Sequence, residues 1–304
     1  MNKSPRPNKS ALLALAWAST LLLSFLPDIL FQELSGTIPN WLYAAKLALI
    51  AALLYLSLFW APARILQKYF FVFLAIFLAE GVGIWLSGLP VWVSWFPLDV
   101  SNFVPYLIGA EFKQLIIAGL VMVGLLLIGL RRQDFFLRPG ELDAPAAPMP
   151  GLGVGKATSW RPLGLRLSLF AFLAMLLATS FYAVDRLTVE AAWAALPFLP
   201  LIIVLAGLSA FSAEIIYRAA LLAPIHHTLG PVHSVALAAA FFGISRFYGL
   251  PLGLLGVLFW GFFGWMLGRS LLETKGLFWP WFIHASANVV MFAFIVIAAV
   301  QLAG

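Results

Sequence analysis

The chain has 304 residues, of which 63% are hydrophobic and only 10% are charged, and its formal net charge is +6. A soluble globular domain carries about a quarter charged residues, so this composition excludes that class and predicts a polytopic membrane protein. The absence of cysteine excludes disulfides, thiolate catalysis and zinc–sulfur sites. The basic residues are spread over several loops instead of one face, so no nucleic-acid partner is expected.

Apolar segments recur along the whole chain, and a transmembrane helix needs roughly 20 such residues. The segment 193–222 is long for one crossing, and it contains Pro197 and Pro200, where a helix could break because proline removes a backbone donor. The sequence predicts an all-α, polytopic transmembrane helical bundle of about 8–9 spans, near 11–30, 41–61, 69–88, 103–130, 164–184, 193–222, 232–248, 252–272 and 279–302.

The basic residues give this bundle an orientation. The loops 31–40 and 89–102 contain no Lys or Arg, whereas the amino terminus and the central loop hold Lys3, Arg6, Lys9, Arg131, Arg132, Arg138, Lys156 and Arg161. Cytoplasmic loops are enriched in Lys and Arg, so both basic regions are predicted to be cytoplasmic. We therefore expect an integral protein of a bacterial cytoplasmic membrane with a cytoplasmic amino terminus.

A polar, Pro- and Gly-rich stretch at 131–163 is predicted to be a cytoplasmic loop. It separates a four-span accessory block, 1–130, from a second transmembrane domain, 164–304, which contains all the polar motifs described below. Small residues suggest close helix contacts; they are Gly119, Gly124, Gly129, Gly264 and Gly268.

Four intramembrane charges lie in the first block: Lys46, Glu80, Glu111 and Lys113. At about 1.5 Å per helical residue, Lys46 lies at a depth similar to those of Glu80 and Glu111. We expect Lys46 to pair with one of these two glutamates and to stabilise the bundle instead of forming a site.

Glu214 and Arg218 are four residues apart in an apolar segment, so they share a helix face and can pair. One interpretation is a buried structural ion pair. The other is a carboxylate that the guanidinium holds ionised, so that it can orient water or a second catalytic group.

His284 and Asn288 are also four residues apart, inside the last apolar segment. They either form interhelical hydrogen bonds or together stabilise a developing oxyanion. Arg246 either snorkels to the membrane interface or faces the same cavity as Glu214. Counting residues places Glu214 and His284 roughly 10 Å deep and Arg246 near 20 Å, so Arg246 joins them only if its helix is tilted or broken.

Three histidines, His226, His227 and His233, flank Gly230-Pro231 in a predicted cytoplasmic turn, where histidines are most often solvated. The chain has no His-Glu-x-x-His pattern, so zinc-protease chemistry of that type has no support. We expect no metal ion and no cofactor.

The polar patterns occur in a fixed order: Glu214-Ile-Ile-Tyr-Arg218, Phe242-Gly-Ile-Ser-Arg246 and His284-Ala-Ser-Ala-Asn288. Over about 164–302 this order resembles the CAAX prenyl endopeptidase and bacteriocin-processing (CPBP, or Abi) family of intramembrane proteases. Its members carry Glu-Glu-x-x-x-Arg, Phe-x-x-x-His and His-x-x-x-Asn in transmembrane helices. The resemblance implies that Glu214, Arg218, His284, Asn288 and, by position, Arg246 form the catalytic site.

Two positions depart from the family pattern. Ala213 stands where the family has the glutamate thought to activate water, and Arg246 stands where it has the first histidine. Alanine cannot accept a proton, and arginine stays cationic and cannot act as a base.

Three functions therefore remain open. The first is a divergent endopeptidase that cuts membrane-associated peptides or proteins, with Glu214 as the base. The second is a non-catalytic pseudoprotease that acts as a membrane scaffold or binding protein. A transporter is the weakest, because the chain shows no inverted repeat.

Overall fold

The computed structural model describes residues 9–99, 102–155, 157–183 and 187–303. Three basic residues of the orientation argument, Lys3, Arg6 and Lys156, lie outside these ranges. The described chain is helical, with turns and two isolated bridges, Pro145–Ser159 and Met149–Val154, in the central loop. An all-α architecture is therefore confirmed.

The elements are α-helical except for two 3-10 helices, η1 and η2, and one π-helical turn, η3. In chain order they are α1 (Lys9–Leu23), α2 (Leu26–Ser35), α3 (Leu42–Leu56), α4 (Ala61–Ile65), α5 (Gln67–Ser87), α6 (Pro90–Trp95), α7 (Phe103–Leu127), η1 (Pro150–Leu152), α8 (Trp160–Ala183), α9 (Val189–Ala195), η2 (Leu196–Phe198), α10 (Leu199–Glu214), η3 (Ile215–Ala219), α11 (Ala220–Leu222), α12 (His226–Ile244), α13 (Gly253–Thr274) and α14 (Phe278–Ala303).

Seven helical segments of the described chain are long and apolar enough to cross a membrane, and the bent pair α1–α2 brings the number to eight. The chain is thus an integral membrane protein, and its span count meets the lower end of the prediction. The expected span 41–61 is instead the 15-residue α3 followed by α4. Proline at the start of α4 explains this division, because its ring suits a first helical turn but interrupts a continuing helix.

The long segment predicted at 193–222 lies within one apolar helical segment whose helix type changes twice. Its 34 residues from Val189 to Leu222 would measure about 51 Å as a straight α-helix, against a hydrocarbon core about 30 Å thick. The path changes to a 3-10 helix at Leu196–Phe198, which contains Pro197, and to a π-helix at Ile215–Ala219. The 3-10 turn coincides with Pro197, but the stretch counts as one candidate span, so the alternatives of a tilt or of a break at Pro197 and Pro200 stay predictions.

Contacts divide the described chain into two units. Unit 1 comprises 1–78, 121–135 and 217–269, and unit 2 comprises 79–120, 136–216 and 270–304. The predicted division at 131–163 into an accessory block and a second transmembrane domain stays a prediction.

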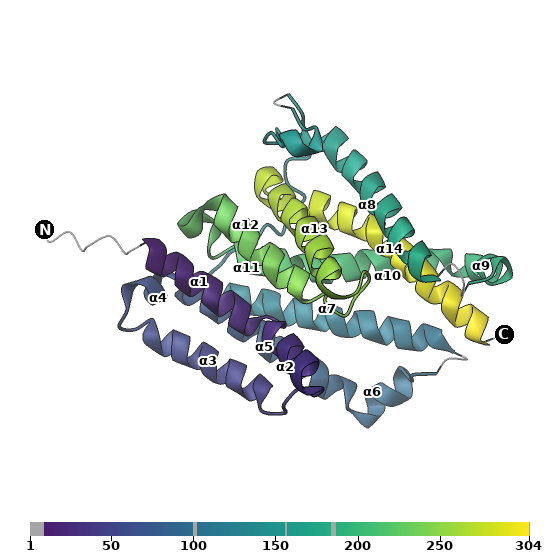
Figure 1. The fold of residues 1–304 in the computed structure, drawn as a ribbon, viewed down its shortest axis with the longest axis horizontal. Coiled ribbons are helices and arrows are strands. Elements are labelled where there is room, and N and C mark those ends of the chain that lie inside the picture. Colours follow the sequence, from purple (N-terminus) through teal and green to yellow (C-terminus); the bar gives the residue numbers. More distant parts are fainter. Residues whose placement is uncertain (1–8, 100–101, 156, 184–186, 304) are drawn as a thin grey trace, which may run out of the picture. The chain divides into compact units, whose positions relative to one another are not determined.

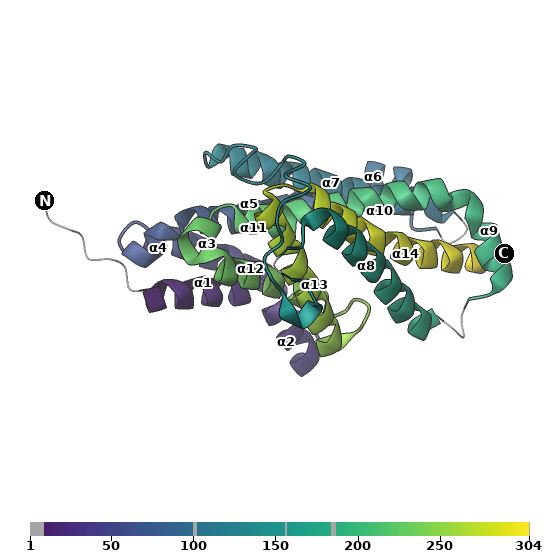
Figure 2. The same ribbon diagram turned by 90° about the horizontal axis from the view of Figure 1, so that it is seen from above.

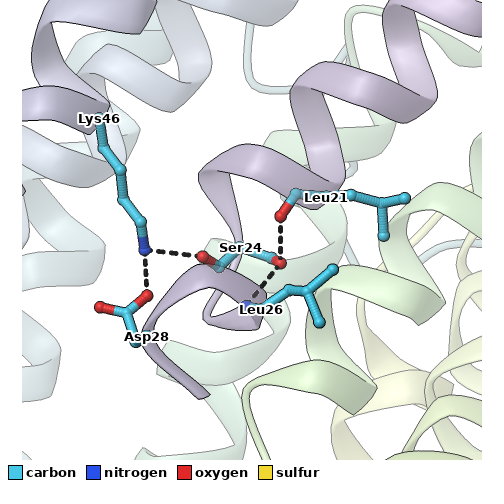
Figure 3. A network of polar contacts seen from close by, with 5 residues as sticks. All are labelled: Leu21, Ser24, Leu26, Asp28 and Lys46. Carbon is cyan, nitrogen blue, oxygen red and sulfur yellow. Dashed lines mark hydrogen bonds and ion pairs between the residues drawn. The ribbon is translucent and has the colours of Figure 1, made fainter. Parts of the chain in front are cut away.

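In unit 1, α1 packs against α2, α4 and α12. The first predicted span bends by 50° between α1 and α2, and Lys46 of α3 reaches this bend (Figure 3). Its Nζ donates to the Ser24 carbonyl oxygen at 2.7 Å and pairs with the Asp28 carboxylate. The prediction that Lys46 pairs with Glu80 or Glu111 is wrong, because the bend between α1 and α2 brings the Ser24 carbonyl oxygen and the Asp28 carboxylate to the lysine.

In unit 2, α14 packs against α8, α9 and α10, and both ribbon views show α14 beside α8 and α10 (Figures 1 and 2). A tight contact lies where α8 meets α14, because a Cβ atom at Gly164 would come within 2.2 Å of the Trp279 ring. The buried core of this unit contains Leu107, Ala195, Ile202, Leu205, Ala206, Phe292 and Val296.

The predicted glycine contacts form at three of five positions. A Cβ atom at Gly124, Gly264 or Gly268 would lie between 2.6 and 3.2 Å from a neighbouring side chain. At Gly119 and Gly129 no atom of the described chain lies within 4 Å of that position. Close approach therefore depends on which face of the helix a glycine occupies.

Candidate functional site

Glu214 and His284, which are 70 positions apart in the sequence, form a buried pair in unit 2. The His284 Nδ1 atom lies 2.7 Å from the Glu214 Oε1 atom. Both residues are shielded from solvent, with exposed fractions of 0% for Glu214 and 1% for His284. Glu214 is the last residue of α10 and His284 lies in the second turn of α14, so the packing of these two helices positions both side chains.

The hydrogen bond to Glu214 determines which ring nitrogen of His284 carries the proton. An ionised carboxylate only accepts hydrogen bonds, so the proton of this contact is assigned to His284 Nδ1. In the neutral imidazole the other nitrogen, Nε2, then carries a lone pair and can accept a proton. A histidine that a carboxylate orients in this way is the base–orienter arrangement of many hydrolases.

A π-helical turn follows Glu214 directly. It spans Ile215–Ala219 and contains Arg218. Single π-turns within α-helices are rare and occur frequently at functional sites. The backbone conformation directly after α10 is therefore of a kind that is frequent at functional sites.

Two buried polar side chains of the same unit lie close to this pair along the chain. Asn288 is 3% exposed and lies one helical turn after His284 on α14. Ser212 is 2% exposed, and its Oγ atom has no hydrogen-bond partner in the described residues. A buried hydroxyl without a partner is costly, so Ser212, two positions before Glu214, is a polar group that the sequence analysis missed.

Arg218 and Arg246 meet at one aromatic ring in unit 1. The Arg218 guanidinium carbon lies 3.7 Å from the Phe242 ring centroid, and that of Arg246 lies 5.0 Å from the same centroid. Trp260 adds a second ring, 5.6 Å from the Arg246 guanidinium carbon. Gly264 leaves room for this cluster, because a Cβ atom there would approach both the Phe242 ring and Arg218 Nη2.

Arg246 follows the end of α12, and its side chain lies against that helix. α12 ends at Ile244, and the Arg246 side chain extends back along it to Phe242, four residues earlier. Helical side chains point toward the amino terminus of their helix, which explains this direction. Its Nε atom is buried and has no hydrogen-bond partner in the described residues, so this atom is not snorkelling into solvent.

The structure thus brings the predicted site residues together in two groups. Glu214 and His284 are in direct contact in unit 2, with Asn288 one turn away on α14. Arg218 and Arg246 share the Phe242 ring in unit 1. The direct pairing of Glu214 with Arg218 stays a prediction.

The position before Glu214 offers no polar group, because Ala213 is a buried alanine, 8% exposed. The structure therefore retains a buried carboxylate–imidazole pair but has no second carboxylate at the adjacent position. Among the described residues, no group of three or more His, Asp or Glu side chains is arranged to hold a metal ion.

The three histidines of the predicted turn lie around the first turns of α12, which bends at Gly230, where φ is +78°. His226 Nδ1 lies 2.9 Å from the Leu222 carbonyl oxygen and therefore donates to it. His227 is exposed and His233 is half-buried. The expectation of solvated histidines in a turn therefore agrees with the structure at His227, whereas His226 and His233 are half-buried in α12.

The sequence analysis did not single out Trp281 as a site residue, because it lies in an apolar run. Its Nε1 atom donates to the Gly207 carbonyl oxygen at 2.8 Å. Trp281 lies three residues before His284 on α14, and Gly207 lies seven before Glu214 on α10. This bond therefore joins the same two helices that carry the buried pair.

Comparison with protein families gives a match in the part of the chain that carries these motifs. Residues 193–290 match the family model described as type II CAAX prenyl endopeptidase Rce1-like. No curated protein and no solved structure matched the chain. The matched segment begins in α9, ends in α14 and contains Glu214, Arg218, Arg246, His284 and Asn288. The match covers less than half of the chain, so it is residues 193–290 that are similar to the Rce1-like CAAX prenyl endopeptidases.

Proposed function

We propose that this membrane protein is a divergent intramembrane endopeptidase, in which His284, oriented by Glu214, activates water. The observation that carries this proposal is the 2.7 Å contact between His284 Nδ1 and Glu214 Oε1, with both side chains buried. It replaces the sequence-based expectation of Glu214 as the direct base, because the hydrogen bond to His284 already occupies one oxygen of that carboxylate.

The proposed reaction is hydrolysis of a peptide bond in a membrane-associated peptide or protein. His284 Nε2 accepts a proton from water as the water oxygen bonds to the carbonyl carbon. The imidazolium then donates this proton to the amine that leaves as the carbon–nitrogen bond breaks. Glu214 stabilises the imidazolium between these steps, as the buried carboxylate does in serine hydrolases.

Asn288 is proposed to stabilise the oxyanion with its amide N–H groups, because it lies one turn from His284 and is buried. Arg218 and Arg246 are assigned to the same reaction through the family motifs. Arg246 offers a planar pair of terminal nitrogens that suits bidentate binding of a substrate carboxylate.

A second candidate function is a non-catalytic pseudoprotease that binds a membrane partner or peptide without cutting it. Two observations favour it: Ala213 replaces the family glutamate, and Arg246 lies near the Phe242 and Trp260 rings where the family has a histidine. An intact buried Glu214–His284 pair is then retained for stability alone.

The test is cleavage of a panel of prenylated and unprenylated membrane peptides by the purified full-length protein. The wild type runs beside Glu214→Gln, His284→Ala and the double change Ala213→Glu with Arg246→His. His227→Ala is the matched control, because that histidine is exposed. We expect Glu214→Gln to lower the rate about 10³–10⁴-fold, the order of loss when an orienting carboxylate becomes an amide.

The outcomes separate the candidates. Wild-type cleavage that His284→Ala abolishes and His227→Ala preserves supports the divergent endopeptidase. An inactive wild type beside an active double variant supports the pseudoprotease. Cleavage that survives both His284→Ala and Glu214→Gln contradicts the proposed use of this pair.

We also propose that the membrane is a bacterial cytoplasmic membrane and that the amino terminus is cytoplasmic, on the distribution of Lys and Arg. Labelling of single cysteines is direct here because the chain has none of its own. A cysteine placed in the central loop should react only from the cytoplasmic side, and reaction from the other side would reverse the orientation.

A further inference from the structure

Unit 2 contains an apolar pocket beside the Glu214–His284 pair. Its cavity volume is about 300 Å³. Phe211 and Trp281, which contribute to its wall, each lie three residues before Glu214 or His284 on the same helix. The lining consists of six apolar or aromatic side chains and one cation: Leu137, Pro139, Phe211, Leu277, Phe278, Trp281 and Arg138.

Backbone contacts hold Arg138 at this pocket. Its Nε donates to the Lys275 carbonyl oxygen at 2.7 Å, and its carbonyl oxygen accepts from Leu277 N at 2.8 Å. The segment around it also packs closely on the α13–α14 connection, since a Cβ atom at Gly140 would lie 2.7 Å from the Gly276 Cα atom. Arg138 is exposed, and these two bonds hold it at the edge of the pocket.

The charge of Arg138 is not neutralised by a carboxylate of the described chain. The neighbouring basic residues are paired: Arg161 Nη2 lies 2.6 Å from Asp143 Oδ2, and Lys275 Nζ lies 3.8 Å from Glu141 Oε1. Arg138 instead bonds through Nε to a carbonyl oxygen, so the bond does not use its two terminal nitrogens. A single positive charge at the edge of apolar walls selects an amphiphilic anion.

The pocket lies at the membrane surface. α13 ends at Thr274 and α14 begins at Phe278, and both are candidate spans, so their short connection is at the interface between lipid and water. Basic pockets between transmembrane helices at this level bind the head groups of anionic lipids. We propose that this pocket binds one anionic glycerophospholipid, with an acyl chain between the aromatic walls and the phosphate on Arg138.

A lipid suits these walls better than a peptide or a free phosphate ion does. A peptide needs hydrogen-bond partners for its backbone, but the Trp281 N–H is already used by Gly207 and the other apolar lining side chains have no polar group. Free phosphate would gain nothing from apolar walls. The inference does not depend on proteolysis, because it concerns binding in the resting protein.

The test measures which lipids stay bound to the purified full-length protein. Protein is reconstituted in nanodiscs of phosphatidylcholine with one-fifth phosphatidylglycerol, transferred to detergent and analysed by native mass spectrometry. The variants are Arg138→Gln, which removes the cation, and Leu137→Trp, which fills the pocket and keeps the cation. Arg166→Gln is the matched control, since Arg166 is an exposed arginine of α8 in the same unit.

We expect the wild type and Arg166→Gln to retain one phosphatidylglycerol in preference to phosphatidylcholine. Arg138→Gln and Leu137→Trp should each lower this retention at least tenfold, with melting temperatures near that of the wild type. If Arg138→Gln fails to fold, Leu137→Trp and competition by added phosphatidylglycerol still test whether the pocket binds this lipid.

Three results would overturn the proposal. One is equal retention of phosphatidylglycerol by the wild type and Leu137→Trp. Another is equal retention of both lipids by the wild type. The third is displacement of the lipid by an unmodified peptide with a free carboxy terminus at low concentration, which would assign the pocket to peptide binding. Each can be observed whether or not the protein cleaves any substrate.

Discussion

Replacing Lys46 by methionine removes the cation that joins α3 to the bend between α1 and α2 (Figure 3). The change leaves the Asp28 carboxylate without its ion-pair partner and the Ser24 carbonyl oxygen without the donor that now lies 2.7 Å away. Methionine has nearly the same length as lysine, so packing changes little and the loss is mainly electrostatic.

The size of the loss follows from burial. Removing one partner of a fully buried ion pair costs about 3–5 kcal/mol. The Lys46 side chain is 8% exposed, but that of Asp28 is 21% exposed, so water partly stabilises the remaining carboxylate. We therefore expect the free energy of unfolding to fall by about 2–4 kcal/mol, somewhat less than for a fully buried pair.

The assay is reversible unfolding in mixed micelles, followed by circular dichroism, for Lys46→Met, Asp28→Leu and the double variant. The double variant should recover most of the loss, because replacing both members of a buried pair is often nearly neutral. Lys68→Met is the control, since Lys68 is exposed in the same unit and surface changes usually stay within about 0.5 kcal/mol. A loss below about 1 kcal/mol for Lys46→Met, or additive single effects, would refute the reasoning.

Two further predictions concern glycine substitutions in unit 2 and the pH dependence of stability at Tyr248. Gly164→Ala should lower the unfolding free energy by about 1–3 kcal/mol, because its Cβ would lie 2.2 Å from the Trp279 ring. Gly119→Ala, in open space on α7, should instead be neutral or stabilise by up to about 1 kcal/mol, and reversal of this order in thermal melts would contradict the contact. Loss of hydration, and then the hydrogen bond to Glu33 and its charge, raise the pKa of Tyr248. The neutral phenol therefore contributes stability below its ordinary pKa of about 10. This contribution is lost as the pH rises through the higher pKa of the folded state. Tyr248→Phe should abolish this part of the pH dependence of the melting temperature at alkaline pH.

The transmembrane architecture was predictable because hydrophobicity is local and additive along a helix. The segments predicted at 69–88, 103–130 and 279–302 correspond to α5, α7 and α14. The change to a 3-10 helix at Pro197 also had a local signal, since proline acts on its own helix. The bend between α1 and α2 had a signal, Pro27 in the first turn of α2, that the sequence analysis did not use.

The π-helical turn at Ile215–Ala219 had no signal in the sequence, because ordinary helix-forming residues make it. The same holds for the aromatic environment of Arg246. Phe242 lies four residues away on the same helix, but Trp260 comes from α13, and nothing in an apolar run distinguishes that tryptophan from its neighbours.

The sequence by itself determined that the chain is a helical membrane protein, which intramembrane residues are polar, and which family their order resembles. The tertiary structure alone decided their partners: Asp28 for Lys46, His284 for Glu214, and the Phe242 ring for Arg218 and Arg246. The physical reason is that in a low-dielectric interior a charge takes the nearest group that can stabilise it. Which group is nearest depends on helix packing, bends and side-chain direction, none of which is encoded by separation along the chain.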